Sequence, residues 1–224
     1  RSSHPESPTF NAETGCYVLL IREDGESQEF TDSGQPGYYT AELDSSFLST
    51  GMMFQVQVFT EDGNEYHSEF DQIRPVPAID SIYYKVEDMI FTGEEESVPG
   101  IRFYVDFTYD NDAYEYIRWE LTETYEFHNP SYETFIYDLD RRVKPTPDSM
   151  VYRVCWITEH VNEIFTLDEG QLEKGPLLRK PLVQVNNQSQ RLKHGYSLLV
   201  RQLSLDEPAF RFWEAMKGNS QEMT

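Results

Sequence analysis

A single amphipathic stretch near the end of the chain, residues 205–217, constrains the fold more than any other feature. Its apolar residues recur at helical spacing: Leu205, Ala209, Phe212, Trp213 and Met216. Ser204 and Glu207 stand three residues apart, the spacing of a capping box, which places the start of a helix at this point. Because nearly all of the remaining chain is predicted to form strands, the helix must bury its aromatic stripe against a sheet. We therefore expect Phe212 and Trp213 to pack on a sheet.

Strands are predicted from the alternation of apolar and polar residues. In the segment 101–109 every second residue is apolar, which is a strict period of two. In the segment 116–125, Ile117, Trp119 and Leu121 share one face. Similar patterns bounded by turn residues predict further strands at 16–21, 29–31, 38–43, 54–59, 65–70, 79–86, 135–139, 151–158, 182–185 and 196–203.

Two domains are expected, because Arg74-Pro75-Val76-Pro77 withholds two amide donors and cannot lie in the middle of a sheet. Residues 1–74, with turn signals about every 8 to 12 residues, are predicted to form a small immunoglobulin-like β-sandwich. Within it, Asp62-Gly63 favours a tight primed turn. Residues 75–80 are expected to be a proline-containing linker. Residues 81–224 are predicted to form a larger antiparallel β-sandwich or partial barrel with the helix packed on it, so the fold class is all-β.

The chain is strongly acidic. Its 224 residues include 18 Lys and Arg against 40 Asp and Glu, a net charge of −22. Such a field repels the phosphates of nucleic acids and anionic lipids, so no nucleic-acid partner is expected. A solvated surface accounts for the charge, although cationic ligands or divalent ions are also compatible with it.

Cys16 and Cys155 each lie in an alternating apolar strand, in different predicted domains. We expect two packed free thiols rather than a disulfide or a catalytic nucleophile. No apolar run approaches the roughly 18 residues of a membrane helix, and residues 1–8 lack a signal-peptide core. Membrane attachment is therefore expected only through an N-terminal lipid that this chain does not include.

No catalytic, cofactor or metal site is predicted. The histidines lack the spacing that brings two imidazoles to one metal: His4, His67, His128, His160 and His194. No Gly-x-Ser-x-Gly elbow is present, so no catalytic triad is assigned. Asp138 and Asp140 share a strand face, as a glycosidase pair might, but nothing around them indicates a raised pKa. A polar turn is the simpler interpretation of a set of oxygen ligands that suit calcium: Asp106, Asp110, Asn111, Asp112 and Glu115.

Aromatic residues are the more suggestive feature. The chain has 15 Tyr and 14 Phe, and such rings provide flat, amphipathic platforms for sugars or for another protein. Most are expected in the core. Three are predicted to be exposed and to form a partner or ligand surface: Tyr104 on the polar face of its strand, and Tyr114 and Tyr132 in polar loops.

Several motifs, in order along the chain, resemble those of one lipoprotein family. They lie at Asp62-Gly63, Pro75 to Ile82, Tyr116 to Glu126, Cys155-Trp156, Tyr196 to Ser204 and Ala209 to Asn219. In these motifs, which span most of the chain, it is similar to the domain-of-unknown-function 4249 family, outer-membrane lipoproteins of Bacteroidota. No lipid-bearing cysteine precedes the first strand, and such proteins usually continue beyond the position of Asn219. The resemblance therefore implies an internal portion of a longer protein.

The resemblance also implies a function. Family members of this kind are typically encoded beside TonB-dependent transporters. This implies a non-catalytic accessory lipoprotein, lipid-anchored at the cell-surface or periplasmic face of the outer membrane, that contacts a transporter and captures a small ligand or glycan. The alternative is a carbohydrate-binding module or a glycan-acting enzyme on a β scaffold. A deep pocket with convergent carboxylates would favour the enzyme, whereas a broad aromatic or acidic surface would favour the interaction protein.

Overall fold

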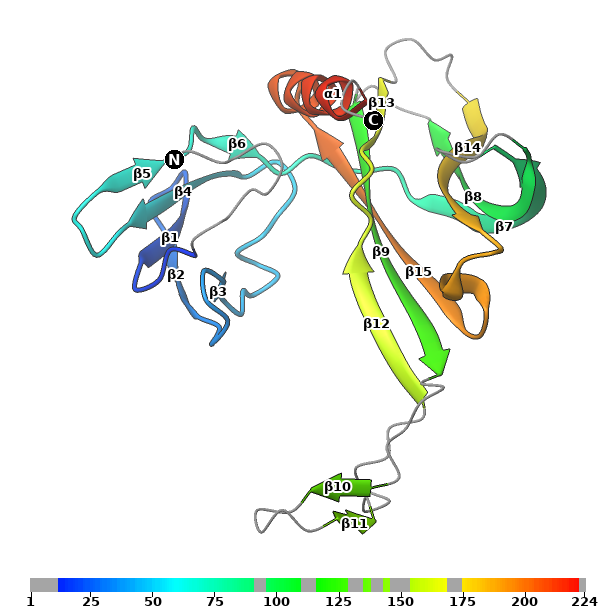
Figure 1. Ribbon diagram of the computed structural model, residues 1–224. Coiled ribbons are helices and arrows are strands. Elements are labelled where there is room, and N and C mark those ends of the chain that lie inside the picture. The colour runs from blue at the N-terminus through cyan, green and yellow to red at the C-terminus, as the bar shows by residue number, and fades with distance from the viewer. Residues whose placement is uncertain are drawn as a thin grey trace. The chain divides into compact units, whose positions relative to one another are not determined.

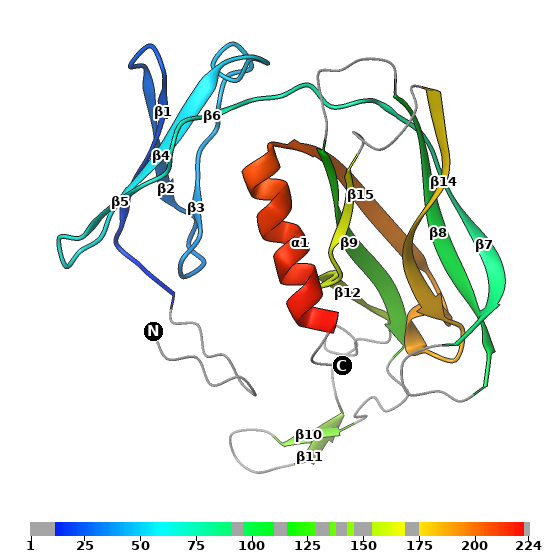
Figure 2. The same ribbon diagram turned by 90° about the horizontal axis from the view of Figure 1, so that it is seen from above.

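The computed structural model describes residues 12–90, 96–109, 116–128, 135–137, 143–145, 154–168 and 175–221. The described residues are mostly β, with antiparallel sheets and one C-terminal helix (Figures 1 and 2). The chain divides after Pro75 into two compact units, Arg1–Pro75 and Val76–Thr224. The division falls at the start of the proline-containing segment 75–80.

The strands of the first unit join in one antiparallel sheet. Their order is β3-β2-β1-β4-β5, and β6 also pairs with β4. The strands are β1 (Tyr17–Arg22), β2 (Ser27–Asp32), β3 (Tyr39–Thr40), β4 (Met53–Phe59), β5 (Glu65–His67) and β6 (Asp71–Gln72). Within the described residues, the two facing sheets of the expected immunoglobulin-like sandwich are therefore not formed. The turn spacing that suggested them is common to any antiparallel meander, because short hairpins alone produce it.

The hairpin at Asp62-Gly63 is present, but its turn is not the predicted primed turn. Thr60 donates its amide to the carbonyl of Asn64 at 2.9 Å and accepts the amide of Gly63 at 3.0 Å, which leaves a three-residue loop between them. A primed turn needs a positive φ at Asp62, and only Gly63, with φ +82°, has one in this loop. A β-carbon on Gly63 would meet no atom within 4 Å, so the backbone angle alone explains the glycine.

In the first unit, one end of one face of the sheet is covered by another part of the unit. Phe54 of β4 is buried beneath Phe47, and their ring centroids lie 5.4 Å apart. Alternate residues of a strand share one face, so Val58 of β4 lies on the same face as Phe54. Val58 pairs with Val18 of β1. Phe47 lies over the Phe54 end, and the surface above Val18 and Val58 is left as an open groove.

The second unit contains two antiparallel sheets that face each other (Figure 2). One has the order β14-β8-β7; in the other, β12, β13 and β15 all pair with β9. Their strands are β7 (Ile79–Met89), β8 (Val98–Tyr109), β9 (Tyr116–His128), β12 (Val154–His160), β13 (Phe165–Asp168), β14 (Gly175–Asn186) and β15 (Tyr196–Leu205). The other described elements are a ribbon of β10 (Phe135–Tyr137) and β11 (Val143–Pro145), and a short 3-10 helix, η3 (Gln190–Leu192). The expectation of a mostly antiparallel β domain with one helix is confirmed for the described strands, which do not close into a barrel.

The core of the second unit lies between its two sheets. Val105 and Phe107 of β8 are buried against Ile117, Trp119 and Leu121 of β9. The alternation predicted for these two strands is confirmed at these positions. Full burial of each such side chain contributes about 1.5 to 3 kcal/mol by area.

The C-terminal helix, α1 (Glu207–Gln221), begins later than predicted, because β15 continues to Leu205. The predicted capping box is wrong. Ser204 lies in the strand, and its Oγ is buried with no hydrogen-bond partner. Asp206 caps the helix instead, since its Oδ1 accepts the amide of Ala209 at 2.8 Å. Glu207 accepts a hydrogen bond from Arg211 Nε at 2.8 Å, one turn along the helix.

The face that α1 turns toward the sheet also differs from the prediction. Phe210 stacks on Tyr116 at a centroid distance of 4.5 Å, and the Arg118 guanidinium lies 3.6 Å from the Trp213 ring centroid. The contact expected of Trp213 is confirmed, but that of Phe212 is wrong, because its side chain is 57% exposed. On the outer face of β9, Tyr116 provides an aromatic ring and Arg118 a cation. Phe210 and Trp213 of the helix stack on these two side chains.

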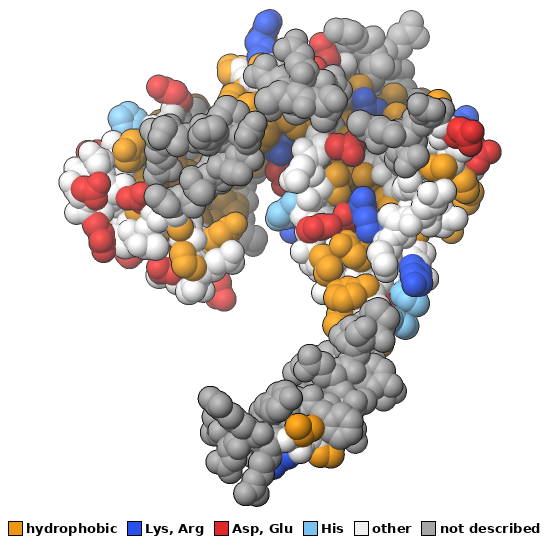
Figure 3. Space-filling model, viewed as in Figure 1, with side chains coloured by type: hydrophobic (Ala, Val, Ile, Leu, Met, Phe, Trp, Pro, Cys, Tyr) orange, Lys and Arg blue, Asp and Glu red, His pale blue; other side chains and the backbone are white. Residues whose placement is uncertain are grey.

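No helix in the described parts of the chain combines the length and apolar character needed to cross a membrane. On the face drawn in Figure 3, both acidic and hydrophobic side chains are exposed on each unit.

Candidate functional site: a groove in the first unit

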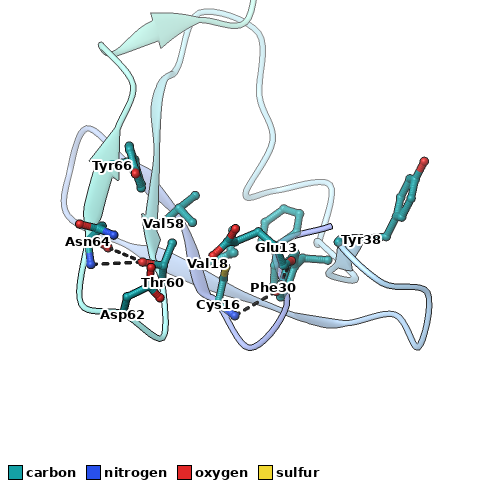
Figure 4. Close-up of a pocket in the computed structure, with 12 residues that line it drawn as sticks. Glu13, Cys16, Val18, Phe30, Tyr38, Val58, Thr60, Asp62, Asn64 and Tyr66 are labelled. Carbon is teal, nitrogen blue, oxygen red and sulfur yellow. Dashed lines mark hydrogen bonds between the residues drawn. The ribbon is translucent and has the colours of Figure 1, made fainter. Parts of the chain in front are cut away.

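An open groove of about 700 Å³ lies over the uncovered end of the first sheet (Figure 4). This volume is within the range of about 300 to 1,000 Å³ that is usual for ligand sites. Its floor consists of Val18, Phe30 and Val58, which are cross-strand neighbours on β1, β2 and β4. The walls and rim are formed by Glu13, Cys16, Gly37, Tyr38, Tyr39, Thr60, Asp62, Asn64 and Tyr66.

Two exposed tyrosines flank the apolar floor. Tyr38 and Tyr66 are 59% and 60% exposed, and Figure 4 shows them on opposite sides of the floor residues. Tyr66 is held by β5, where it pairs with Val58, and Tyr38 immediately precedes β3. Exposed phenol rings beside an apolar floor offer stacking surfaces with a polar tip.

Tyr39 fixes one wall of the groove. Its hydroxyl accepts the Cys16 amide at 2.9 Å and donates to the Glu13 carbonyl at 3.1 Å. The side chain of Cys16 raises the pKa of the Tyr39 phenol above its ordinary value, and this outweighs the lowering effect of the Cys16 backbone amide. Gly15, with φ +68°, passes so close to Glu61 that a β-carbon would overlap the carboxylate. Because the Glu61 side chain could move, the positive φ is the reason for a glycine where this wall joins the hairpin.

The rim adds hydrogen-bonding groups. Glu13 and Asp62 contribute carboxylates, and Asn64 contributes a side-chain amide. The backbone amide of Asn64 donates a hydrogen bond to Thr60 Oγ1 at 3.1 Å. Together with the tyrosines they suit a ligand with several hydroxyl groups, neutral or cationic. Anions are disfavoured by the two carboxylates and by the net charge of −22.

The thiols are free, as predicted: Cys16 at the groove and Cys155 in β12.

The structure does not place the predicted aromatic surface where it was expected. Tyr104 is on the outer face of β8 but is only 6% exposed, because it stacks on Tyr83 and donates to Glu87 Oε1 at 2.7 Å. The prediction that Tyr104 is an exposed platform is therefore wrong. Tyr114 and Tyr132 lie outside the described residues. The same is true of Asp138 and Asp140.

The second unit contains a buried carboxylate whose hydrogen-bond donors give it a structural role. Glu123 of β9 is 4% exposed, and its Oε2 accepts hydrogen bonds from Arg191 Nε at 3.0 Å and from the Tyr196 hydroxyl at 2.7 Å. Burial, together with this bond to Glu123, raises the pKa of the Tyr196 phenol. The cluster ties β9 to β15 and to η3, and its carboxylate is engaged by two donors.

A row of exposed apolar side chains follows the edge strand β7. Ile82, Tyr84 and Val86 occupy alternate positions, and Val86 is 72% exposed. By register they pair with Val105, Phe103 and Ile101, so they extend the core-facing side of that sheet beyond its buried part. We call these three residues the β7 stripe. Contiguous exposed apolar residues of this kind mark contact surfaces.

Sequence reasoning missed both the groove and the β7 stripe. Tyr38 and Tyr66 are separated in sequence, and no spacing rule connects them, since the pairing of β4 with β5 and of β2 with β3 brings them to one groove. The β7 stripe had a signal, the alternation in residues 79–86, but alternation does not show which apolar faces remain uncovered.

A family model described as a domain of unknown function, DUF4249, matches residues 1–224. No curated protein matches the chain. No solved structure matches it either.

Proposed function

We propose that this chain, which belongs to the DUF4249 family, is a non-catalytic interaction protein that captures a ligand in the groove of its first unit. We propose further that it acts with a TonB-dependent transporter at the outer membrane, lipid-anchored in the full-length protein. The observation that carries the proposal is the groove, in which Tyr38 and Tyr66 flank an apolar floor beside Glu13, Asp62 and Asn64.

A glycan is the ligand class that this lining favours. Sugar rings present apolar C–H faces that stack on tyrosine and hydroxyl groups that donate to carboxylates and amides. The groove is open, so it suits part of an oligosaccharide rather than a fully enclosed small molecule. Its acidic rim disfavours anionic sugars.

The ligand test is a screen of neutral oligosaccharides followed by titration calorimetry. Tyr38→Ala and Tyr66→Ala should each weaken binding by about 3- to 10-fold, since an aromatic contact contributes roughly 0.5 to 1.5 kcal/mol beyond its buried area. Tyr17→Ala is the matched control, because Tyr17 is an exposed tyrosine at a β1 position that alternates away from the groove. Equal affinity losses in all three variants, or no binding to any oligosaccharide, would contradict the groove assignment.

The β7 stripe supports the transporter part of the proposal. Stable protein contacts bury more than about 1,000 Å² with aromatic residues near the centre, and Tyr84 is flanked on the strand by Ile82 and Val86. The test is gentle extraction of the tagged, full-length protein from its own membrane and identification of the proteins that accompany it. A TonB-dependent transporter should co-purify with the unaltered protein and be lost with Tyr84→Asp.

Leu199→Asp is the control for that experiment, because it places the same charge at an exposed apolar position on β15. A protein that runs alone, or a transporter retained equally by both variants, would contradict the assigned contact.

The alternative is a glycan-acting enzyme, and the rim carboxylates give it a specific test. Glu13→Gln and Asp62→Asn would abolish hydrolysis of a bound oligosaccharide if either acts as an acid, base or nucleophile. We expect the unaltered protein to leave the oligosaccharide intact, as read by mass spectrometry. Turnover that one of these substitutions removes would replace the interaction role with the enzymatic one.

A further inference from the structure

Two histidines and a glutamate meet at the end of β9, in the second unit. Glu126, His128 and His194 each offer a ligand atom, and these atoms all lie within 4.8 Å of one another. Sequence spacing argued against such a cluster, because His194 is remote from the other two. Strand pairing assembles it: Tyr125 is opposite Tyr196, and the Glu126 amide donates to the Gly195 carbonyl at 2.8 Å.

The side chains are already engaged with one another. Glu126 and His128 stand two positions apart on one strand, hence on one face, and His128 Nε2 lies 2.6 Å from Glu126 Oε1. The rings of His128 and His194 stack with centroids 3.7 Å apart and planes 12° from parallel. Both histidines are exposed, and Glu126 is half-buried.

We propose that Glu126, His128 and His194 form a binding site for a transition-metal dication of the Zn²⁺ class. Two imidazole nitrogens and one carboxylate oxygen are a ligand set that Zn²⁺ accepts, whereas Ca²⁺ and Mg²⁺ prefer oxygen ligands alone. Three protein ligands leave one tetrahedral position for water or for a group from another molecule. A bound cation would link β9 to the residue that leads into β15.

Binding requires two small movements. Ligand atoms on one tetrahedral Zn²⁺ stand about 3.3 Å apart, by bond lengths of about 2.0 to 2.1 Å, so Glu126 Oε1 and His128 Nε2 must separate slightly. Parallel stacked imidazoles cannot both aim in-plane lone pairs at one point, so one ring must turn about χ2, a soft torsion for histidine. The exposure of both histidines allows this without disturbing the core.

One side of the site is fixed by packing. A β-carbon placed on Gly195 would lie 3.2 Å from the Trp156 ring and 3.3 Å from Glu126 Oε2. The Trp156 ring and the Glu126 carboxylate therefore both lie against the backbone at Gly195. This contact holds the carboxylate beside the residue that follows His194.

The test is titration of the intact protein, first freed of metal with a chelator, with Zn²⁺ by calorimetry and with Co²⁺ by visible absorption. One cation per chain should bind through the cluster, and Co²⁺ should develop the d–d bands of a nitrogen-containing site. His128→Ala and His194→Ala should each weaken binding by more than about tenfold, since even residues that only support a ligand change affinity by about 10- to 100-fold.

His160→Ala is the matched control, because His160 lies on β12, bonds Thr122 and is not part of the cluster. Ca²⁺ controls for diffuse attraction to the acidic surface, and its binding should not change in any of these variants. Unchanged Zn²⁺ affinity in His128→Ala and His194→Ala, or an equal loss in His160→Ala, would overturn the proposal.

Nuclear magnetic resonance of the unaltered protein gives a second readout that does not depend on folding of a variant. Of the five histidine rings, Zn²⁺ should shift those of His128 and His194. Shifts in neither ring, or equal shifts in all five, would overturn the proposal.

Discussion

Among the described residues, Glu123 is the charged side chain that is buried, and its two donors come from β15 and from η3. Glu123→Gln keeps the shape but leaves the Arg191 guanidinium without its counter-charge in a half-buried position. We expect the free energy of unfolding to fall by about 1 to 3 kcal/mol, less than the loss for a fully buried pair. Chemical denaturation measures this change in the free energy of unfolding.

Glu120→Gln is the matched control, since Glu120 lies on the same strand and pairs with Arg118 at 2.6 Å, but is exposed enough for solvent to screen the pair. Similar losses for the two variants would contradict a special role of the buried carboxylate.

Trp213 gives a second test of a single side chain. Its ring lies on Arg118, and it is only half-buried, so Trp213→Ala should cost about 2 kcal/mol rather than the roughly 3 to 5 kcal/mol of a fully buried ring. Phe212→Ala should change stability by no more than about 0.5 kcal/mol, because Phe212 is mostly exposed. Thermal or urea unfolding of both variants checks the pair. A larger loss for Phe212→Ala would show that the helix packs through the other face.

The start of α1 is the clearest test of an element. Asp206→Ala removes the acceptor for the Ala209 amide and should destabilise the protein by about 1 kcal/mol. Ser204→Ala should be neutral or stabilising, because the Ser204 hydroxyl is buried without a partner. The capping box expected from the sequence predicts the reverse for Ser204. Equilibrium unfolding of the two variants distinguishes the two caps, and a loss of about 1 kcal/mol in Ser204→Ala would favour the capping box.

For the whole molecule, the two cysteines report on how the chain is divided. Cys16 belongs to the first unit and Cys155 to the second, and both are free. Alkylation of the denatured protein without reductant should therefore add two labels, as read by intact mass. A mass without labels would indicate a bond between them.

The sequence by itself determined the local elements of this protein. The alternation in 101–109 and 116–125 predicted the faces that form the core, and helical spacing predicted a helix that packs Trp213 on a sheet. These patterns succeed because the period of a strand or helix is a property of neighbouring residues. The same kind of pattern gave a wrong prediction for the start of the helix and for the turn at Asp62-Gly63, because the residue types at these two places are compatible with more than one cap or turn.

Only the tertiary structure decided which distant residues meet. The pairing of β4 with β5 and β2 with β3 puts Tyr66 and Tyr38 at one groove, and the pairing of β9 with β15 puts His194 beside His128. The burial of Tyr104 and the exposure of the β7 stripe were likewise set by what covers each face. Strand register and the covering of a sheet face depend on contacts between segments far apart in the chain. Periodicity within one segment contains no information about such contacts.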